Sequence, residues 1–398
     1  MAWIEIARTG VTSVRLHPWR SIATVLCVVA VLVPYLAGLA ICGGLADEAA
    51  QSIDAGADLY VTGRQFGRSV PLPLDAADKI AALPGVTSAV PRIVGRLAIG
   101  EERHSVVVLG MPPDKLPESA SLVDGRWFTA DDSNELVVGS ALAAGLKVKV
   151  DALLPPFYQN RQGERISKVV GIFSHDAPLW QANLMFTSFK TAARLFDQPA
   201  LATDILVRCR TGSEEELAAA FHRQLHWTGP DGSRLDVRVT SRQELEALWA
   251  AAAAHRDGVF QLHWMLALSV AVLAVLVTSA YGTSQRRSEV AVLKAIGWRT
   301  DEVLVRSGVE GLLLGLAGAA VSVLIAWVWL RGMNGYGIAD LFLPTLGLQP
   351  QVRIPCRLLP VPVLIGALLS WIVVTSGSLY ATWRTAMTPP AHVLRSSG

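Results

Sequence analysis

"RRSEVAVLKAIGW", residues 286–298, is a charged, helix-prone segment between two hydrophobic runs that are too long for the core of a soluble domain. On a helix, one face carries a carboxylate and three apolar side chains: Glu289, Val292, Leu293 and Ile296. Arg287 and Lys294 lie roughly opposite, and Gly297 provides a helix stop before Trp298. The pattern predicts an amphipathic helix that either lies on anionic lipid headgroups or contacts a partner protein. Glu289 is expected in its first turn, where a negative charge complements exposed backbone N–H groups.

Hydrophobic runs dominate the composition of the 398-residue chain, which is 52% hydrophobic and 17% charged. In a typical soluble domain roughly a quarter of all residues are charged. Each run approaches the roughly 20 residues that cross a bilayer, and a helix satisfies its own backbone hydrogen bonds there. We therefore predict four transmembrane helices, at residues 21–45, 258–281, 303–330 and 358–381. The first run is too long for the apolar core of a cleaved signal peptide, which favours a retained helix.

Basic residues near the ends of the runs predict sidedness. They gather in three segments: residues 1–20, 282–302 and 382–398. With four spans these segments share one side, so both termini and the loop that contains 286–298 are predicted to be cytoplasmic. Residues 46–257 and the loop 331–357 are then predicted outside. The net charge of +2 is too small to suggest a nucleic-acid partner.

The predicted external segment, residues 46–257, alternates strand and helix patterns. Five stretches resemble short strands: "ADLYVTG", "SVVVLG", "NELVVG", "SKVVGIF" and "ATDILVRC". Two capping boxes, Ser213 with Glu216 and Ser241 with Glu244, predict helices, and the second helix continues into the span at 258 as a stalk. The fold class is therefore an α-helical membrane protein with a large α+β domain, of one or two lobes, between its first and second transmembrane helices.

Small residues recur at steps of three or four along the third span: Gly308, Gly311, Gly315, Gly318 and Ser322. Such a stripe predicts the close approach of another helix, either from this chain or from a second protomer. Glu310 stands near the predicted cytoplasmic end of the same span. A functional carboxylate and an interfacial one are equally consistent with that position.

No motif for metal binding or nucleotide hydrolysis is evident. His222 and His226 are spaced i, i+4, but with no third ligand a solvated helix face is favoured over a metal site. For the cysteines, free thiols are favoured over a Cys209–Cys356 disulfide. No catalytic constellation can be assembled, and the phosphate loop GxxxxGK[ST] is absent. We therefore expect that the chain is not an enzyme and binds no cofactor.

The segment 286–298 resembles the R-x-x-E-[IV]-[AG]-[VI]-L-[KR]-A-[LI]-G signature of the permease superfamily that includes the macrolide exporter MacB, the lipoprotein-releasing LolC and LolE, and FtsX. The matching places are occupied by Arg287, Glu289, Val290, Leu293, Lys294, Ala295 and Gly297, and Arg286 lies just before them. The resemblance extends to "HPWRSIATVL" near the N-terminus, "GLLLGLAGAA" after Glu310, "YATWRTAMTPPAHVLR" in the tail, and "LPGVTSAVP", "LVDGRWF" and "VVGIF" in the external segment.

The resemblance implies a bacterial inner-membrane permease with a MacB-like periplasmic core domain. It implies a homo- or heterodimer in which each protomer pairs with a separate ABC ATPase that binds ATP and Mg²⁺. In that family the segment 286–298 forms the coupling helix that docks on the ATPase, which displaces the lipid-headgroup interpretation. The implied coupling residues are Arg286, Arg287, Glu289, Val292, Leu293, Lys294, Ile296 and Gly297.

Two functions fit this family. The first is export or extraction of an amphipathic or envelope substrate, with membrane lipid and a periplasmic adaptor or substrate protein as further partners. The alternative is an FtsX-like signalling module that activates a cell-wall hydrolase without transport. The size of the external segment favours the exporter. A receptor with a simple membrane anchor does not explain four spans with a glycine stripe.

Overall fold

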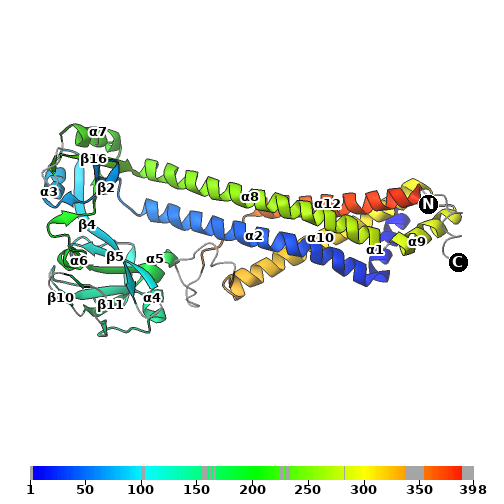
Figure 1. The fold of residues 1–398 in the computed structure, drawn as a ribbon, viewed down its shortest axis with the longest axis horizontal. Helices are drawn as coiled ribbons and strands as arrows, with labels where there is room; N and C mark the ends of the chain where they lie inside the picture. The colour runs from blue at the N-terminus through cyan, green and yellow to red at the C-terminus, as the bar shows by residue number, and fades with distance from the viewer. Residues whose placement is uncertain are drawn as a thin grey trace. The chain divides into compact units, whose positions relative to one another are not determined.

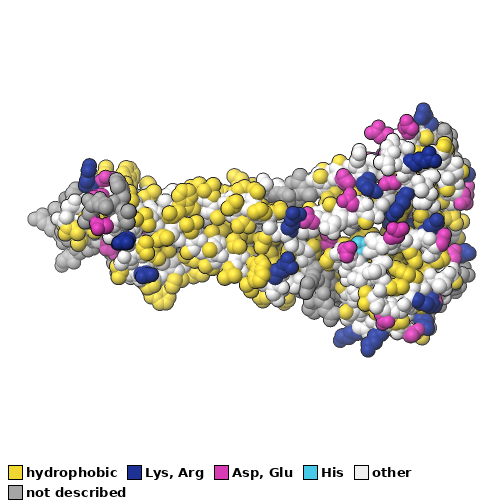
Figure 2. Space-filling view, turned by 180° about the vertical axis from the view of Figure 1, so that it is seen from behind, with side chains coloured by type: hydrophobic (Ala, Val, Ile, Leu, Met, Phe, Trp, Pro, Cys, Tyr) yellow, Lys and Arg dark blue, Asp and Glu magenta, His cyan; other side chains and the backbone are white. Residues whose placement is uncertain are grey.

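The computed structural model describes residues 3–99, 104–131, 133–154, 159–160, 163–164, 167–224, 227–228, 234–281, 283–337 and 354–387. The chain divides into two compact units (Figure 1). The helical unit comprises residues 1–44, 254–338 and 356–398, and the sheet unit comprises residues 45–253 and 339–355. Hydrophobic side chains dominate the long helices on the face drawn in Figure 2, whereas charged side chains are more frequent over the sheet unit.

Six helices supply the described part of the helical unit: α1 (Trp3–Leu16), α2 (Pro18–Asp54), α8 (Arg242–Tyr281), α9 (Thr283–Ala295), α10 (Thr300–Gly332) and α12 (Pro360–Ala386). Three of them, α2, α10 and α12, are long and apolar enough to cross a membrane. The fourth predicted span, 258–281, lies in α8 and is helical throughout, but many of its side chains fall outside the described residues. The count of four spans therefore stays a prediction.

The small-residue stripe of α10 lies against two helices of the same chain. A Cβ added at Gly311 or Gly315 would stand 3.0 Å from a backbone Cα of α12, that of Thr375 or of Trp371. Gly318 faces α2 instead, where an added Cβ would lie 2.8 Å from Val28. At Gly308, by contrast, the nearest atom would be 3.9 Å away. The stripe thus allows close packing within one protomer.

Ser322, the last member of the stripe, is fully buried, and its hydroxyl donates to the carbonyl of Gly318 at 2.7 Å. Around the stripe, apolar side chains of α2, α10 and α12 form one core: Val28, Leu32, Val33, Leu36, Leu314, Ala319, Ala326 and Val374. In a membrane such a core is held by close packing rather than by exclusion of water.

The sheet unit is built on one large sheet with the strand order β15-β16-β1-β14-β4-β5-β12-β7-β11-β6, to which β2 and β8 add at β1 and β11. Its strands are β1 (Leu59–Gln65), β2 (Arg68–Val70), β4 (Val86–Ile99), β5 (His104–Met111), β6 (Ala120–Gly125), β7 (Glu135–Gly139), β8 (Leu153–Leu154), β11 (Ser167–His175), β12 (Leu184–Ser188), β14 (Asp204–Cys209), β15 (Trp227–Thr228) and β16 (Arg234–Ser241). Two short pairs stand apart: β3 (Leu72–Pro73) with β13 (Leu201–Ala202), and β9 (Gln159–Asn160) with β10 (Gly163–Glu164).

Strand β4 joins two lobes of this sheet. Its residues 86–92 pair with β14, whereas its residues 93–99 pair with β5. Helices α3 (Asp75–Ala81) and α7 (Glu214–Gln224) contribute to the core of the first lobe, and α4 (Ser140–Gly145) contributes to one core of the second. An aromatic cluster that includes Phe128, Phe173 and Phe186 forms a further core of the second lobe. Helix α6 (Phe189–Leu195) contributes to both lobes, and α5 (Pro178–Asn183) follows β11.

The five strand patterns are confirmed as β1, β5, β7, β11 and β14, and the helix predicted after Ser213 is α7. The Ser241 cap is also present, because its hydroxyl accepts the backbone N–H of Glu244 at 3.1 Å. All four cysteines are free, so the disulfide alternative is not formed. No group of three metal-ligating side chains occurs among the described residues. The side chains of His222 and His226 lie outside them.

Candidate functional site

Helix α9 contains the first ten residues of the opening motif, 286–295, and begins earlier than the sequence pattern suggested. It starts at Thr283, so Glu289 lies in its second turn and not in the first. The predicted stop is confirmed at Gly297, whose φ of +98° is a left-handed conformation that favours glycine. The N–H groups of Gly297 and Trp298 donate to the carbonyls of Lys294 and Leu293 at 3.1 and 3.0 Å. The helix therefore ends at a fixed point.

The inner face of α9 is held by a small apolar cluster. Val290 and Trp298 are buried with side chains from three other helices: Ile6 of α1, Val303 of α10 and Ala386 of α12. Leu293 is half-buried against the same cluster. The expectation that Leu293 belongs to the outward apolar face is therefore wrong. It lies about 100° around the helix from Val292, which brings it to the side that packs on α10.

Polar contacts fix the same helix. The Nε2 atom of His17, the residue between α1 and α2, lies 2.5 Å from a carboxylate oxygen of Glu289. Arg306 of α10 lies 4.0 Å from the other oxygen of Glu289. On the far side, the ammonium group of Lys294 donates to the carbonyl of Ala386 in α12 at 2.5 Å. Glu289 and Lys294 thus join α9 to its neighbours.

The outer face of α9 carries the two remaining apolar side chains. Val292 is 50% exposed and Ile296 is 69% exposed. Their spacing of four residues places them side by side on the helix surface. Arg286 and Arg287 belong to α9, but their side chains lie outside the described residues. The helix therefore combines an anchored inner face with an exposed apolar pair.

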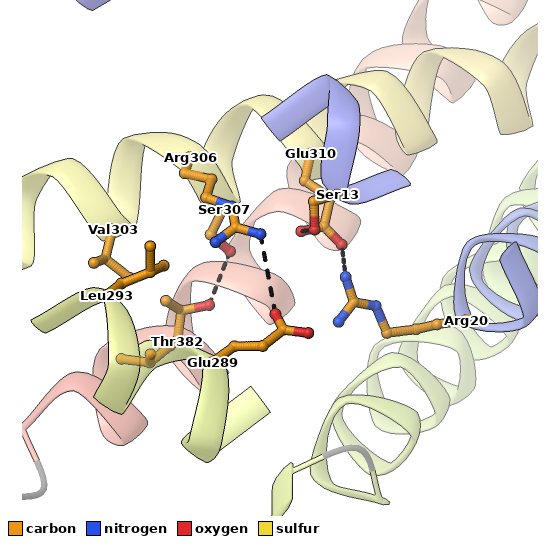
Figure 3. A pocket seen from close by; sticks show the side chains of 10 residues that line it. Ser13, Arg20, Glu289, Leu293, Val303, Arg306, Ser307, Glu310 and Thr382 are labelled. Carbon is orange, nitrogen blue, oxygen red and sulfur yellow. Dashed lines mark hydrogen bonds and ion pairs between the residues drawn. The ribbon is translucent and has the colours of Figure 1, made fainter. Parts of the chain in front are cut away.

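A small pocket lies behind α9 (Figure 3). Glu310 lines it and is only 5% exposed. Its carboxylate accepts hydrogen bonds from Arg20 of α2 and from the hydroxyl of Ser13 of α1, the latter at 3.3 Å. Glu310 is therefore buried and joins α10 to α1 and α2. Whether it is a functional or an interfacial carboxylate stays a prediction. In the same wall, the hydroxyls of Ser307 and Thr382 lie 2.8 Å apart and link α10 to α12.

The pocket joins helices and contains no reactive pair among its described side chains. Glu289 contacts Arg306 and Glu310 contacts Arg20, and the hydroxyls of Ser307 and Thr382 contact each other. Such paired groups have few open positions for a ligand or a metal. The described contacts around the pocket therefore hold the helices that line it together.

Two family models match the chain: the MacB-like periplasmic core domain over residues 21–224 and the FtsX-like permease C-terminal region over residues 264–390. The chain belongs to the MacB- and FtsX-like family of ABC transporter permeases. The sheet unit falls largely within the first match, and α9, α10 and α12 fall within the second. Membership of this family implies an ATPase partner.

Similar proteins include an uncharacterized ABC transporter permease found in two strains of Mycobacterium tuberculosis. It is 26% identical over 302 residues, which cover 74% of this permease and 76% of the relative. The periplasmic region of MacB from Actinobacillus actinomycetemcomitans aligns with a TM-score of 0.36 and 16% identity, covering 50% of this chain and 95% of that one. The extracellular domain of the noncanonic ABC-type transporter YknZ from Gram-positive bacteria aligns with a TM-score of 0.34 and 13% identity. The alignment covers 46% of this chain and 99% of that one.

Proposed function

We propose that this permease is the membrane subunit of an ABC exporter, and that a separate ATPase subunit binds the exposed apolar pair Val292 and Ile296 on α9. The observation that carries the proposal is the contrast between the two faces of this helix. The inner face is buried against α1, α10 and α12, whereas the outer face exposes two aliphatic side chains. Covering one such side chain contributes about 1.5–3 kcal/mol when burial is complete.

The inner face of α9 supports the second half of the proposal, the transfer of force. Because Glu289 contacts His17 and Arg306, and Lys294 contacts the end of α12, a displacement of α9 acts on several helices at once. Packed interfaces of this kind move as units and do not deform continuously. ATP and Mg²⁺ bind in the partner, and this chain supplies no catalytic group.

The proposed topology has four spans, with both termini and α9 in the cytoplasm and the sheet unit on the opposite side of the inner membrane. Three candidate spans and the helical course of α8 over residues 258–281 support it. Basic residues beside α9 support the cytoplasmic assignment. The functional assembly is a dimer of permeases, homo- or heteromeric, that moves an amphipathic or envelope substrate outward, with an adaptor or substrate protein on the outer side.

The docking step is tested by co-purification of the permease with its neighbouring ATPase in one detergent. Val292→Asp and Ile296→Asp each place a charge in the proposed contact, where an unpaired charge costs about 3 kcal/mol or about a hundredfold in affinity. The matched control is Met333→Asp. Met333 is 59% exposed and follows the C-terminal end of α10, whereas α9 precedes its N-terminal end. We expect loss of the ATPase with the two α9 variants and full retention with the control. Retention with all three variants contradicts the proposal and favours contact of α9 with lipid.

Export and signalling share this docking step and differ in the cargo. We expect lipids or peptides to co-elute with the complex and to be released when ATP is added. ATP-dependent activation of a cell-wall hydrolase, with no released molecule, supports the signalling alternative instead.

A further inference from the structure

Two long helices, α2 and α8, are connected to neighbouring strands of the sheet unit. Helix α2 ends at Asp54 and β1 begins at Leu59, while β16 ends at Ser241 and α8 begins at Arg242. Strands β1 and β16 are antiparallel, and Leu59 pairs with Ser241. The ends of α2 and α8 within the sheet unit, which we call the helix roots, therefore lie side by side at one end of this strand pair.

Asp58, in the short link between α2 and β1, uses every one of its polar groups. Its N–H donates to the carbonyl of Val207 at 3.1 Å, and its carbonyl accepts the N–H of Arg242 at 3.0 Å. One carboxylate oxygen accepts the guanidinium of Arg242 at 2.8 Å, and the other accepts the N–H of Cys209 at 3.0 Å. One residue thus ties the first residue of α8 to the link that follows α2.

The link is also held on the α2 side. The backbone N–H of Ala57 donates to the hydroxyl of Tyr60 at 3.2 Å, so the link after α2 is attached to β1. The backbone ladder of β1 and β16 stops at Leu59 and Ser241. Beyond that pair, the side-chain and backbone contacts between Asp58 and Arg242 join the two roots.

We propose that Asp58 and Arg242 are positioning residues that hold the two helix roots together, so that displacement of α2 and α8 reaches the sheet unit as one movement. This inference rests on the proposed function, because it assigns the last step of the same transmission. A charged pair that is partly shielded from solvent and joined by a backbone hydrogen bond fixes both separation and direction. Since the strand ladder does not depend on it, its removal leaves the fold and frees the roots.

A second ion pair in the same sheet provides the control. Arg92 of β4 and Asp204 of β14 form two hydrogen bonds of 2.8 Å each, and both side chains are more buried than Asp58 and Arg242. This pair lies on strands that are not continuous with either root. Asp204→Asn is therefore expected to cost at least as much stability as Asp58→Asn without affecting the roots.

The experiment measures the distance between spin labels at Gln51 in α2 and Glu246 in α8, both exposed and both in the sheet unit. It uses the full chain with its ATPase, with the four native cysteines replaced and labelled chains diluted with unlabelled ones. We expect one narrow distance distribution without nucleotide, a clear broadening in Asp58→Asn and Arg242→Gln, and partial recovery in Arg242→Lys. Asp204→Asn should match the parent.

An unchanged distribution in Asp58→Asn, or equal broadening in Asp204→Asn, overturns the proposal. Addition of ATP then separates this inference from the proposed function. In the Asp58→Asn complex the ATPase should still bind and hydrolyse ATP. The mean distance between the two labels should then shift in this variant and stay unchanged in the parent. If the distance distribution of Asp58→Asn broadens without nucleotide but the ATPase does not bind, the role of the Asp58–Arg242 pair is upheld and the proposed function is refuted.

Discussion

At the scale of single residues, His175 shows how burial sets the properties of the sheet unit. It is 7% exposed, its Nδ1 accepts the N–H of Ala177 at 2.9 Å, and its ring stacks on Trp180 with centroids 4.6 Å apart. Burial lowers the pKa of His175, so the ring is neutral in the fold. Protonation would remove the acceptor on which this turn depends.

The stability of the permease should accordingly fall in acid. A histidine with a lowered pKa contributes stability that is present above its unfolded pKa, about 6.5, and is lost as the pH drops below that value. We expect the melting temperature of the purified chain to fall from pH 7.5 to pH 5.5, and to fall less in His175→Asn, which keeps an acceptor and does not titrate. The check is thermal unfolding of both proteins at several pH values, and equal slopes would exclude His175 as the cause.

Cys209 offers a chemical probe of Asp58. Burial, followed by the charge of Asp58 beside it, raises the pKa of the Cys209 thiol to about 11. We expect the rate of alkylation of Cys209, in a chain without the other three cysteines, to rise with a midpoint near that pH. In Asp58→Asn the midpoint should move down, because a negative neighbour has been removed. The same midpoint in both proteins would mean that the Asp58 carboxylate does not act on the thiol.

Sequence patterns predicted some of the candidate-site residues correctly and misplaced others. The stop at Gly297 follows from local backbone preference and was predictable. The inward packing of Leu293 was not, because it depends on Val303 and the end of α12, far along the chain. His17 was missed for the same reason, although the His-Pro pair at the break between α1 and α2 marks a special position.

At the scale of elements, the α10 stripe predicts opposite outcomes for two similar substitutions. Gly315→Ala places a Cβ 3.0 Å from the backbone of Trp371, which cannot yield, so we expect a loss of about 1–3 kcal/mol in stability. Gly308→Ala meets only ordinary contact distances and should change little. The measurement is thermal unfolding in detergent. Equal stability of the two variants would show that α10 and α12 do not pack as described.

The strands were predictable because each carries a local pattern that ends in glycine or a polar residue. Their order in the sheet was not. Strand β4 changes partners between residues 92 and 93, and the pairing of β1 with both β14 and β16 joins segments far apart in the chain. Such pairings depend on packing between distant segments, which a pattern within one segment does not reveal.

At the scale of the whole molecule, the four-span topology predicts the side on which each segment is labelled. Cysteines placed at Arg8 and Arg299, both exposed, should react with an impermeant reagent only after the membrane is opened. A cysteine at Glu215 of α7, also exposed, should react from outside in intact cells with a permeable outer layer. Labelling of position 299 from outside would contradict both the topology and the docking of an ATPase on α9.

Binding of an ATPase to α9 through Val292 and Ile296 can be tested in the membrane. The most direct measurement places a photo-crosslinking amino acid at Ile296, and separately at Met333 as control, in membranes that contain the neighbouring ATPase. We expect a covalent adduct with the ATPase from position 296 and none from position 333. No ATPase adduct at 296, or equal adducts from both positions, would contradict it.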